Sequence, residues 1–199
     1  VTKNQYDAIA IEYRLVENTP AQKYVYDNEL IDFIKKNGQG KKVLVLHAGS
    51  GYRARLAKKL GAKEVIGIDL SHKQIQIARE EEITNQQRII YHIIDPYSSD
   101  FINTIPTELL GKFDIVLGFF LLDHAANKED LKRVINHVYK LLTSKGVFFG
   151  MLDNSETQLP SDPRYGVVIN LEENNSQKIE DNSLRRISIY QHGLEVLHF

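Results

Sequence analysis

One stretch of the sequence, Val43–Asp69, constrains the fold more than any other part of the chain. It begins with an apolar run, Val43–Leu46, passes through a turn that contains Gly49 and Gly51, and continues as a helical pattern. A second apolar run then ends at Asp69. Strands that are apolar at every position are typical of parallel sheets covered on both faces. The stretch therefore predicts a parallel β-α-β unit.

The glycine turn would lie at the carboxyl end of the first strand, where open α/β sheets bind their ligands. Gly49 and Gly51 would let a ligand approach the main chain closely. Asp69 stands 20 residues after Gly49, the usual place for a carboxylate that binds a ribose diol. The pattern predicts a cofactor that contains a nucleoside. Since Gly49, Gly51 and Ala54 also match the dinucleotide fingerprint, a nicotinamide dinucleotide is one alternative, and a tight turn without a ligand is another.

The length, charge and composition limit the class of protein. The 199 residues suffice for one domain with a sizeable core, and a net charge of −1 gives no general attraction to nucleic acid or membranes. The absence of cysteine excludes disulfides and cysteine metal ligands, and no apolar run approaches the roughly 20 residues that span a bilayer. Arg53, Arg55, Lys58 and Lys59 form a basic run that we interpret as a solvated face. We expect a cytoplasmic protein without nucleic-acid or membrane partners.

The first forty residues predict two helices that precede the β-α-β unit. Tyr6, Ile9, Ala10 and Tyr13 share one helical face. A second apolar stripe ends near Gly38. Helices in this place could form a lid over a ligand crevice.

After Asp69 the sequence alternates between helices and strands. Ser71 is the expected N-cap of a helix that runs through Glu82. Strands are expected over residues 89–94, 113–119 and 147–152. An amphipathic helix over 127–142 precedes the last strand, with a turn at Lys145–Gly146. Five strands that alternate with helices predict an α/β fold with a doubly wound, mostly parallel, Rossmann-like sheet.

Beyond Asn154 the pattern changes to strands alone. Tyr165–Leu171, Leu184–Tyr190 and Leu194–Phe199 predict antiparallel strands. The last strand is apolar and would leave an unpaired edge, which favours association, so a homodimer is one expected partner state. The predicted single domain, 1–199, comprises N-terminal lid helices over 1–40, a cofactor-binding core over 41–154 and an incomplete antiparallel tail over 155–199.

Three stretches of the sequence resemble the class I S-adenosylmethionine-dependent methyltransferases. They are YDAIAIEY near the start, VLVLHAGSGY with GIDLS in the middle, and FFLLDHAANKEDLKRVINHVYKLLTSKGVFFGMLDN later. The chain most resembles the toxoflavin-synthase-like small-molecule methyltransferases, and its antiparallel tail with DPRYGV also suits that group. The resemblance implies an enzyme that moves a methyl group from S-adenosylmethionine to N or O of a small-molecule substrate and releases S-adenosylhomocysteine.

The resemblance also implies which residues would bind the cofactor. The glycine turn would pass beneath its methionine part with His47, Ala48, Gly49, Ser50 and Gly51. Asp69 would bind the two ribose hydroxyls, with Leu70 against the adenine; the alternative for Asp69 is a solvated acid at a strand end. Asp95 would accept a hydrogen bond from the adenine amino group, although an acid before a proline is also common in turns.

Other residues would lie on the acceptor side of the crevice. By the same resemblance, Phe119 and Phe120 would line it after the fourth strand, and Tyr13 would face the cofactor or the substrate. His124 follows the fourth strand on the same rim, so it could act as a catalytic base, or instead begin or pack the next helix. Methyl transfer mainly needs a placed nucleophile and excluded water, so we expect no metal centre.

Two positions depart from the pattern of the family that the chain resembles. Val45 stands where such families have an acid, which steadies the turn and the methionine amino group. His47 stands where they have a glycine, and it brings a Cβ and a ring into the turn.

Relatives also continue past the antiparallel strands with a helix and a strand pair. A methyltransferase-like binding protein with impaired catalysis is therefore the second hypothesis, and an NAD(P)-binding oxidoreductase is the third.

Overall fold

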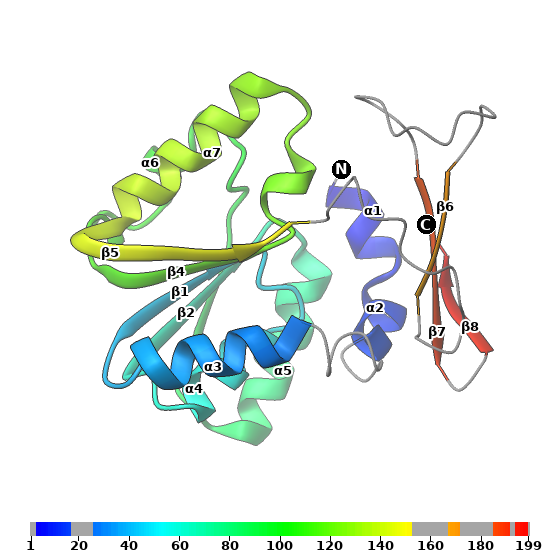
Figure 1. Ribbon diagram of the computed structural model, residues 1–199, viewed down its shortest axis with the longest axis horizontal. Helices are drawn as coiled ribbons and strands as arrows, with labels where there is room; N and C mark the ends of the chain where they lie inside the picture. Colours follow the sequence, from blue (N-terminus) through cyan, green and yellow to red (C-terminus); the bar gives the residue numbers. More distant parts are fainter. Residues whose placement is uncertain (1–2, 17–25, 153–166, 172–184, 192–193, 199) are drawn as a thin grey trace. The chain divides into compact units, whose positions relative to one another are not determined.

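The computed structural model describes residues 3–16, 26–152, 167–171, 185–191 and 194–198 (Figure 1). The chain divides into two compact units. The larger comprises Val1–Ala8 and Leu30–Leu152, and the smaller comprises Ile9–Glu29 and Asp153–Phe199. That the whole chain acts as one domain stays a prediction. No helix in the described ranges combines the length and the apolar character needed to cross a membrane.

A five-stranded parallel sheet forms the centre of the larger unit (Figure 1). Its strands are β1 (Lys42–Leu46), β2 (Glu64–Asp69), β3 (Ile90–Ile93), β4 (Phe113–Phe119) and β5 (Leu142–Met151). All neighbours pair in parallel, in the order β3-β2-β1-β4-β5. The direction of winding reverses between β1 and β4, so the switch point lies at the carboxyl ends of these strands. The predicted doubly wound sheet is confirmed.

Helices cover both faces of this sheet, with α3, α4 and α5 on one face and α6 and α7 on the other (Figure 1). The helices are α1 (Lys3–Ala8), α3 (Asp27–Asn37), α4 (Tyr52–Lys59), α5 (His72–Asn85), α6 (Phe101–Thr104) and α7 (Lys128–Leu141), with short 3-10 helices η2 (Thr107–Leu109) and η3 (Leu122–His124). Ser71 caps α5 as predicted, since its side chain accepts a hydrogen bond from Gln74 N. Asn127 caps α7 in the same way, through Asp130 N.

The core explains why the apolar runs predicted the strands well. All four residues of Val43–Leu46 are at most 1% exposed, because β1 lies in the middle of the sheet with helices on both faces. Between the sheet and α6 and α7 lies a cluster of buried side chains that includes Leu44, Phe101, Phe113, Val134 and Leu141. Burying each such side chain contributes about 1.5–3 kcal/mol.

The first predicted helix is wrong in one respect, because it is broken at Ile9. The two pieces are α1 and α2 (Ala10–Val16). Helices this short have little stability of their own, so packing decides where they end. Helix α1 packs against α5 in the larger unit, whereas α2 packs against the smaller unit's own strands.

The turn predicted at Lys145–Gly146 is also wrong, because β5 follows α7 directly. Phe113 pairs with Leu142, but Ile115 pairs with Val147, so the extra residues of β5 form an irregular segment at this point. A Cβ on Gly146 would come within 2.9 Å of the Phe113 carbonyl oxygen. The glycine therefore permits a bulge inside the strand where the sequence indicated a turn before it.

The smaller unit contains an antiparallel sheet of three strands, β6 (Val167–Leu171), β7 (Arg185–Gln191) and β8 (Leu194–His198), with β7 in the middle. Helix α2 packs against β7 and β8. The predicted antiparallel pairing is confirmed for these strands. Tyr165, Leu184 and Phe199, at which strands were expected to begin or end, lie outside the described residues.

Candidate functional site

The turn after β1 has the left-handed backbone that favours glycine. Gly49 has a φ of 54° and Gly51 a φ of 84°, and Gly51 is the N-cap residue of α4. His47 shares this conformation with a φ of 57°, which costs a residue with a Cβ on the order of 1 kcal/mol. The turn closes with a hydrogen bond from Gly51 N to Ala48 O at 2.9 Å. Both predicted glycine positions are thus needed for the backbone itself.

The Asp69 carboxylate, at the end of β2, binds this turn. Its Oδ2 accepts a hydrogen bond from Gly49 N at 2.8 Å, and its Oδ1 accepts one from Ser71 N at 2.9 Å. Burial raises the pKa of Asp69, and the N–H groups of Ser71, Gly49 and Leu70 oppose that rise. A carboxylate has about four acceptor positions, so Asp69 can hold the turn and still accept bonds from a ligand. Its role toward a ribose stays a prediction.

Helix α1 is attached to the rim beside Asp69. Asp7 Oδ1 accepts hydrogen bonds from Ser71 Oγ at 2.5 Å and from Lys73 N at 3.0 Å. A carboxylate at the N-terminus of α5 is also favoured by the helix dipole. Helix α1 is therefore held at the ligand edge of the sheet, and its role as a lid stays a prediction.

Gln74, in the first turn of α5, is a residue that the sequence analysis missed. It is 1% exposed, and neither atom of its amide has a hydrogen-bond partner among the described residues. Its Oε1 lies 4.0 Å from the position that a Cβ on Gly49 would take. A buried amide without partners costs about 1–3 kcal/mol, which makes Gln74 a further candidate for ligand binding at the turn. The one sequence signal for Gln74 is that it is a polar residue on the otherwise apolar face of its helix.

Two histidines meet across the switch point of the sheet. His47 follows β1 and His124 ends η3 after β4, and their ring centroids are 4.9 Å apart. The hydroxyl of Tyr6, from α1, lies 3.2 Å from His124 Nε2 and within hydrogen-bond distance. Burial lowers the pKa of His47 to about 4, and burial together with the charge of His47 lowers that of His124 to about 3.

Both imidazoles are therefore neutral near pH 7 and can donate or accept hydrogen bonds. With a pKa of about 3, His124 is a weak base for a substrate proton. Its contact with Tyr6 also supports the alternative of a packing role. The catalytic role of His124 stays a prediction.

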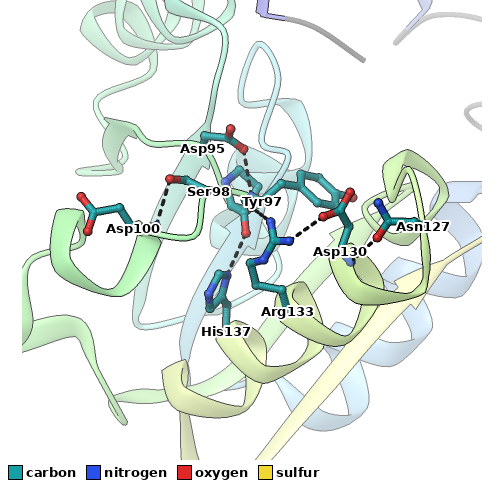
Figure 2. A network of polar contacts seen from close by, with 9 residues as sticks. Asp95, Tyr97, Ser98, Asp100, Asn127, Asp130, Arg133 and His137 are labelled. Carbon is teal, nitrogen blue, oxygen red and sulfur yellow. Dashed lines mark hydrogen bonds and ion pairs between the residues drawn. The ribbon is translucent and has the colours of Figure 1, made fainter.

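The chain after β3 brings Asp95 to the same edge of the sheet. A β-turn forms over Asp95–Ser98, in which Ser98 N donates to Asp95 O at 3.2 Å and Tyr97 N donates to Asp95 Oδ1 at 2.8 Å (Figure 2). The Asp95 carboxylate is exposed. The Tyr97 ring centroid lies 5.9 Å from that of His47, and burial raises the pKa of the Tyr97 hydroxyl.

The basic run on α4 is only partly a solvated face, which corrects the interpretation from sequence. The Arg53 guanidinium lies over the Phe119 ring, 4.2 Å from its centroid, and 6.0 Å from that of Phe120. Arg55 Nη1 donates to Ser50 O at 2.7 Å and so supports the glycine turn. Phe119 is buried and Phe120 half-buried at the end of β4.

The structure thus brings most of the predicted site residues to one edge of the sheet. They lie at or just after the carboxyl ends of β1, β2, β3 and β4, and they are the glycine turn, Asp69 and Leu70, Asp95, and Phe119, Phe120 and His124. Tyr13 belongs to the smaller unit, so its role at this site stays a prediction. Within the described ranges, no three His, Asp or Glu side chains gather as they would around a metal ion.

A family comparison gives a match over the parallel sheet. A family model described as a methyltransferase domain matches residues 43–146, more than half of the 199 residues. The match begins in β1 and ends in β5. It therefore includes the glycine turn, Asp69, Asp95 and His124.

Two curated relatives match a similar share of the chain. The ribosomal protein L11 methyltransferase of Thermotoga petrophila is 31% identical over 126 residues, which cover 62% of this chain and 42% of that protein. The ubiquinone biosynthesis O-methyltransferase of Pelagibacter ubique is 28% identical over 134 residues, which cover 64% of this chain and 50% of that protein. The chain spans half of the length of these relatives or less.

A solved structure agrees with these matches. The structure is described as an S-adenosylmethionine-dependent methyltransferase from Listeria monocytogenes and superimposes with a TM-score of 0.50 at 25% identity. The superposition covers 64% of this chain and 52% of that chain. The shared architecture is the parallel sheet with its flanking helices.

Proposed function

The chain belongs to the family of methyltransferase domains, and from this premise we propose that it binds S-adenosylmethionine and transfers the methyl group to N or O of a small molecule. S-adenosylhomocysteine is the second product. The activity is a proposal because the chain matches only part of the length of these relatives.

The observation that carries the proposal is the bond between the Asp69 carboxylate and Gly49 N. It joins the carboxyl ends of β1 and β2, where a sheet of this kind binds a nucleotide-like ligand. The remaining acceptor positions of Asp69 suit the two ribose hydroxyls, and the backbone of Gly49 and Gly51 suits the methionine part. Leu70, half-buried beside Asp69, is the proposed adenine contact, together with the exposed Asp95.

When bound, S-adenosylmethionine supplies a methyl group on a positively charged sulfur that a nucleophile can displace in line. The residues of this chain would orient the two reactants and exclude water from them. Phe119 and Phe120, at the end of β4, are proposed to line the crevice together with His47 and Tyr97. The buried Nε2 of His47 and the buried hydroxyl of Tyr97 have no partner among the described residues, so both can bind a polar group.

The proposed acceptor is a small molecule whose nucleophile loses its proton easily. His124, held by Tyr6, is the proposed base, and its low pKa suits an acidic hydroxyl or N–H better than a simple alcohol. The resemblance to the toxoflavin-synthase-like group and a relative named for ubiquinone biosynthesis support this class. Relatives named for ribosomal protein L11 make a protein acceptor the alternative. Tyr13 is proposed to face the substrate.

Calorimetric titration with S-adenosylhomocysteine tests the proposal, beside Asp69→Asn and a matched control, Asp114→Asn. Asp114 also accepts a main-chain hydrogen bond, from Lys42 N at 2.9 Å, but at the amino end of the sheet. We expect the wild type to bind, Asp69→Asn to bind at least tenfold more weakly, because a charged hydrogen bond contributes about 1.5–3 kcal/mol, and Asp114→Asn to bind as the wild type does. Binding of a nicotinamide dinucleotide instead would favour the oxidoreductase.

The second candidate is a binding protein that has lost turnover. It is favoured by His47, which brings a ring into the glycine turn, where it contacts the rings of His124 and Tyr97. A chain that binds S-adenosylhomocysteine but transfers no labelled methyl group to a broad panel of small molecules would support this candidate. A homodimer and a cytoplasmic location stay proposals, which sedimentation and cell fractionation can test.

A further inference from the structure

The β-turn at the end of β3 leaves two of its carbonyl groups to partners elsewhere. Asp95 and Pro96 occupy the first two positions, which these residue types favour in β-turns. The turn's own bonds use the carbonyl and carboxylate of Asp95 as acceptors. The carbonyls of Pro96 and Tyr97 take no part in them.

Helix α7 supplies a donor to each of these two carbonyls (Figure 2). His137 Nδ1 lies 2.9 Å from Pro96 O, and Arg133 Nη1 donates to Tyr97 O at 2.8 Å. Because a carbonyl only accepts, the Nδ1 of His137 carries the proton. The residues Asp130, Arg133 and His137 lie on one face of α7, at spacings of three and four residues.

Both donors are fixed in place by further contacts. Arg133 Nη2 pairs with Asp130 Oδ1 at 2.7 Å, and Asp130 N donates to Asn127 Oδ1 at 2.9 Å (Figure 2). The His137 ring is 4% exposed and stacks on Phe101 with centroids 4.7 Å apart. Burial lowers the pKa of His137, so the ring stays neutral and its donor stays in place.

We propose that Arg133 and His137 are positioning residues for cofactor recognition: by holding the carbonyls of Tyr97 and Pro96 they set the direction of the Asp95 carboxylate toward the adenine amino group. The inference rests on the proposed function, because it needs an adenine beside Asp95. It adds Arg133 and His137 to the determinants of adenine specificity. Both act through the turn and not by contact with the cofactor.

Three variants of the turn's donors and one control variant separate positioning from mere stability. Arg133→Met and His137→Phe remove the donors but keep the volume of the side chains. His137→Asn keeps an N–H near the position of Nδ1 and is the conservative rescue. Arg79→Met is the matched control, because Arg79 Nη2 also donates to a main-chain carbonyl, Tyr91 O at 2.6 Å, but within β3 and away from the turn.

The probes are S-adenosylhomocysteine and its deaminated counterpart, in which inosine replaces adenosine, and each is titrated by calorimetry. We expect the wild type to prefer the adenosine compound. Arg133→Met and His137→Phe should each reduce that preference by about fivefold or more, the effect of one hydrogen bond. His137→Asn should keep the preference, because it keeps the donor to Pro96 O. Arg79→Met should also keep it, because a general loss of stability weakens the binding of both compounds alike.

The other possible results separately contradict the positioning role, the role of Asp95 or the proposed function. Variants that bind but keep the full preference for adenosine overturn the positioning role and leave the proposed function intact. A wild type that binds both compounds equally overturns the role of Asp95, and the inference with it. A wild type that binds neither overturns the proposed function as well. Because Arg133 and His137 act through different carbonyls, either variant decides the question should the other fail to fold.

Discussion

Asp69 shows at the scale of one residue how a structural and a functional task share a side chain. The spacing from Gly49 to Asp69 predicted a ligand acid, but the structure shows its carboxylate bonded to Gly49 N and Ser71 N. These bonds follow from the parallel pairing of β1 and β2, which places both strand ends side by side. A spacing rule cannot separate an acid that binds a ligand from one that holds the loop, because both need the same position.

The contact between His47 and His124 could not be predicted for a different reason. The two residues are far apart in the sequence, and only the strand order places β1 next to β4. The sequence indicated the parallel sheet but not which strands are neighbours. His47 and His124 were therefore separate candidates before the structure joined them.

A pH dependence of stability follows from this pair. The pKa values of His47 and His124 in the folded chain are about 4 and about 3, below the ordinary value of 6.5. Between pH 6.5 and these lowered values, the unfolded chain therefore binds more protons than the folded chain. Stability is thus fully present above about pH 6.5 and falls as the pH drops toward 4, by up to about 1.4 kcal/mol per pH unit for each histidine. Urea unfolding at pH 7, 6 and 5 should show a smaller fall for His124→Gln than for the wild type.

The control is His72→Gln, which removes an exposed histidine at the start of α5. Its stability should follow the pH as the wild type does. Equal slopes for the wild type and His124→Gln would show that His124 does not need to stay neutral in the fold.

At the scale of single elements, buried strands were easier to predict than short helices. Strands β1, β2 and β4 lie inside the sheet, and their continuous apolar runs identified them. The break at Ile9 depends on what α1 and α2 pack against, which no local pattern contains. Arg133 and His137 were missed because their spacing on α7 is the same as that of an ordinary solvated helix face.

The attachment of α1 to α5 makes a prediction for this element. Asp7→Ala removes the acceptor of the hydrogen bonds from Ser71 Oγ and Lys73 N, which we expect to cost about 1 kcal/mol. Hydrogen exchange followed by mass spectrometry should be faster in α1 and in the first turn of α5.

Asn127→Ala is the matched control, because it removes the equivalent acceptor at the N-terminus of α7. It should speed exchange at the start of α7 and leave α1 unchanged. Unchanged exchange of α1 in Asp7→Ala would show that Asp7 does not attach α1 to α5.

At the scale of the whole molecule, fold and family agree. The stretch Val43–Asp69 predicted a β-α-β unit with its glycine turn, and the family match covers the parallel sheet that contains this unit. The likeness to the toxoflavin-synthase-like group stays a proposal, because the family model and the solved structure identify methyltransferases and not this subgroup. The class of cofactor is thus better supported than the class of acceptor.

The most direct measurement is a crystal structure of the chain with S-adenosylhomocysteine. The account predicts both ribose hydroxyls within about 2.6–3.2 Å of the Asp69 carboxylate, with the glycine turn beneath the homocysteine part. A ligand bound elsewhere, or an Asp69 carboxylate that contacts only Gly49 and Ser71 while the ligand lies in the crevice, would contradict it.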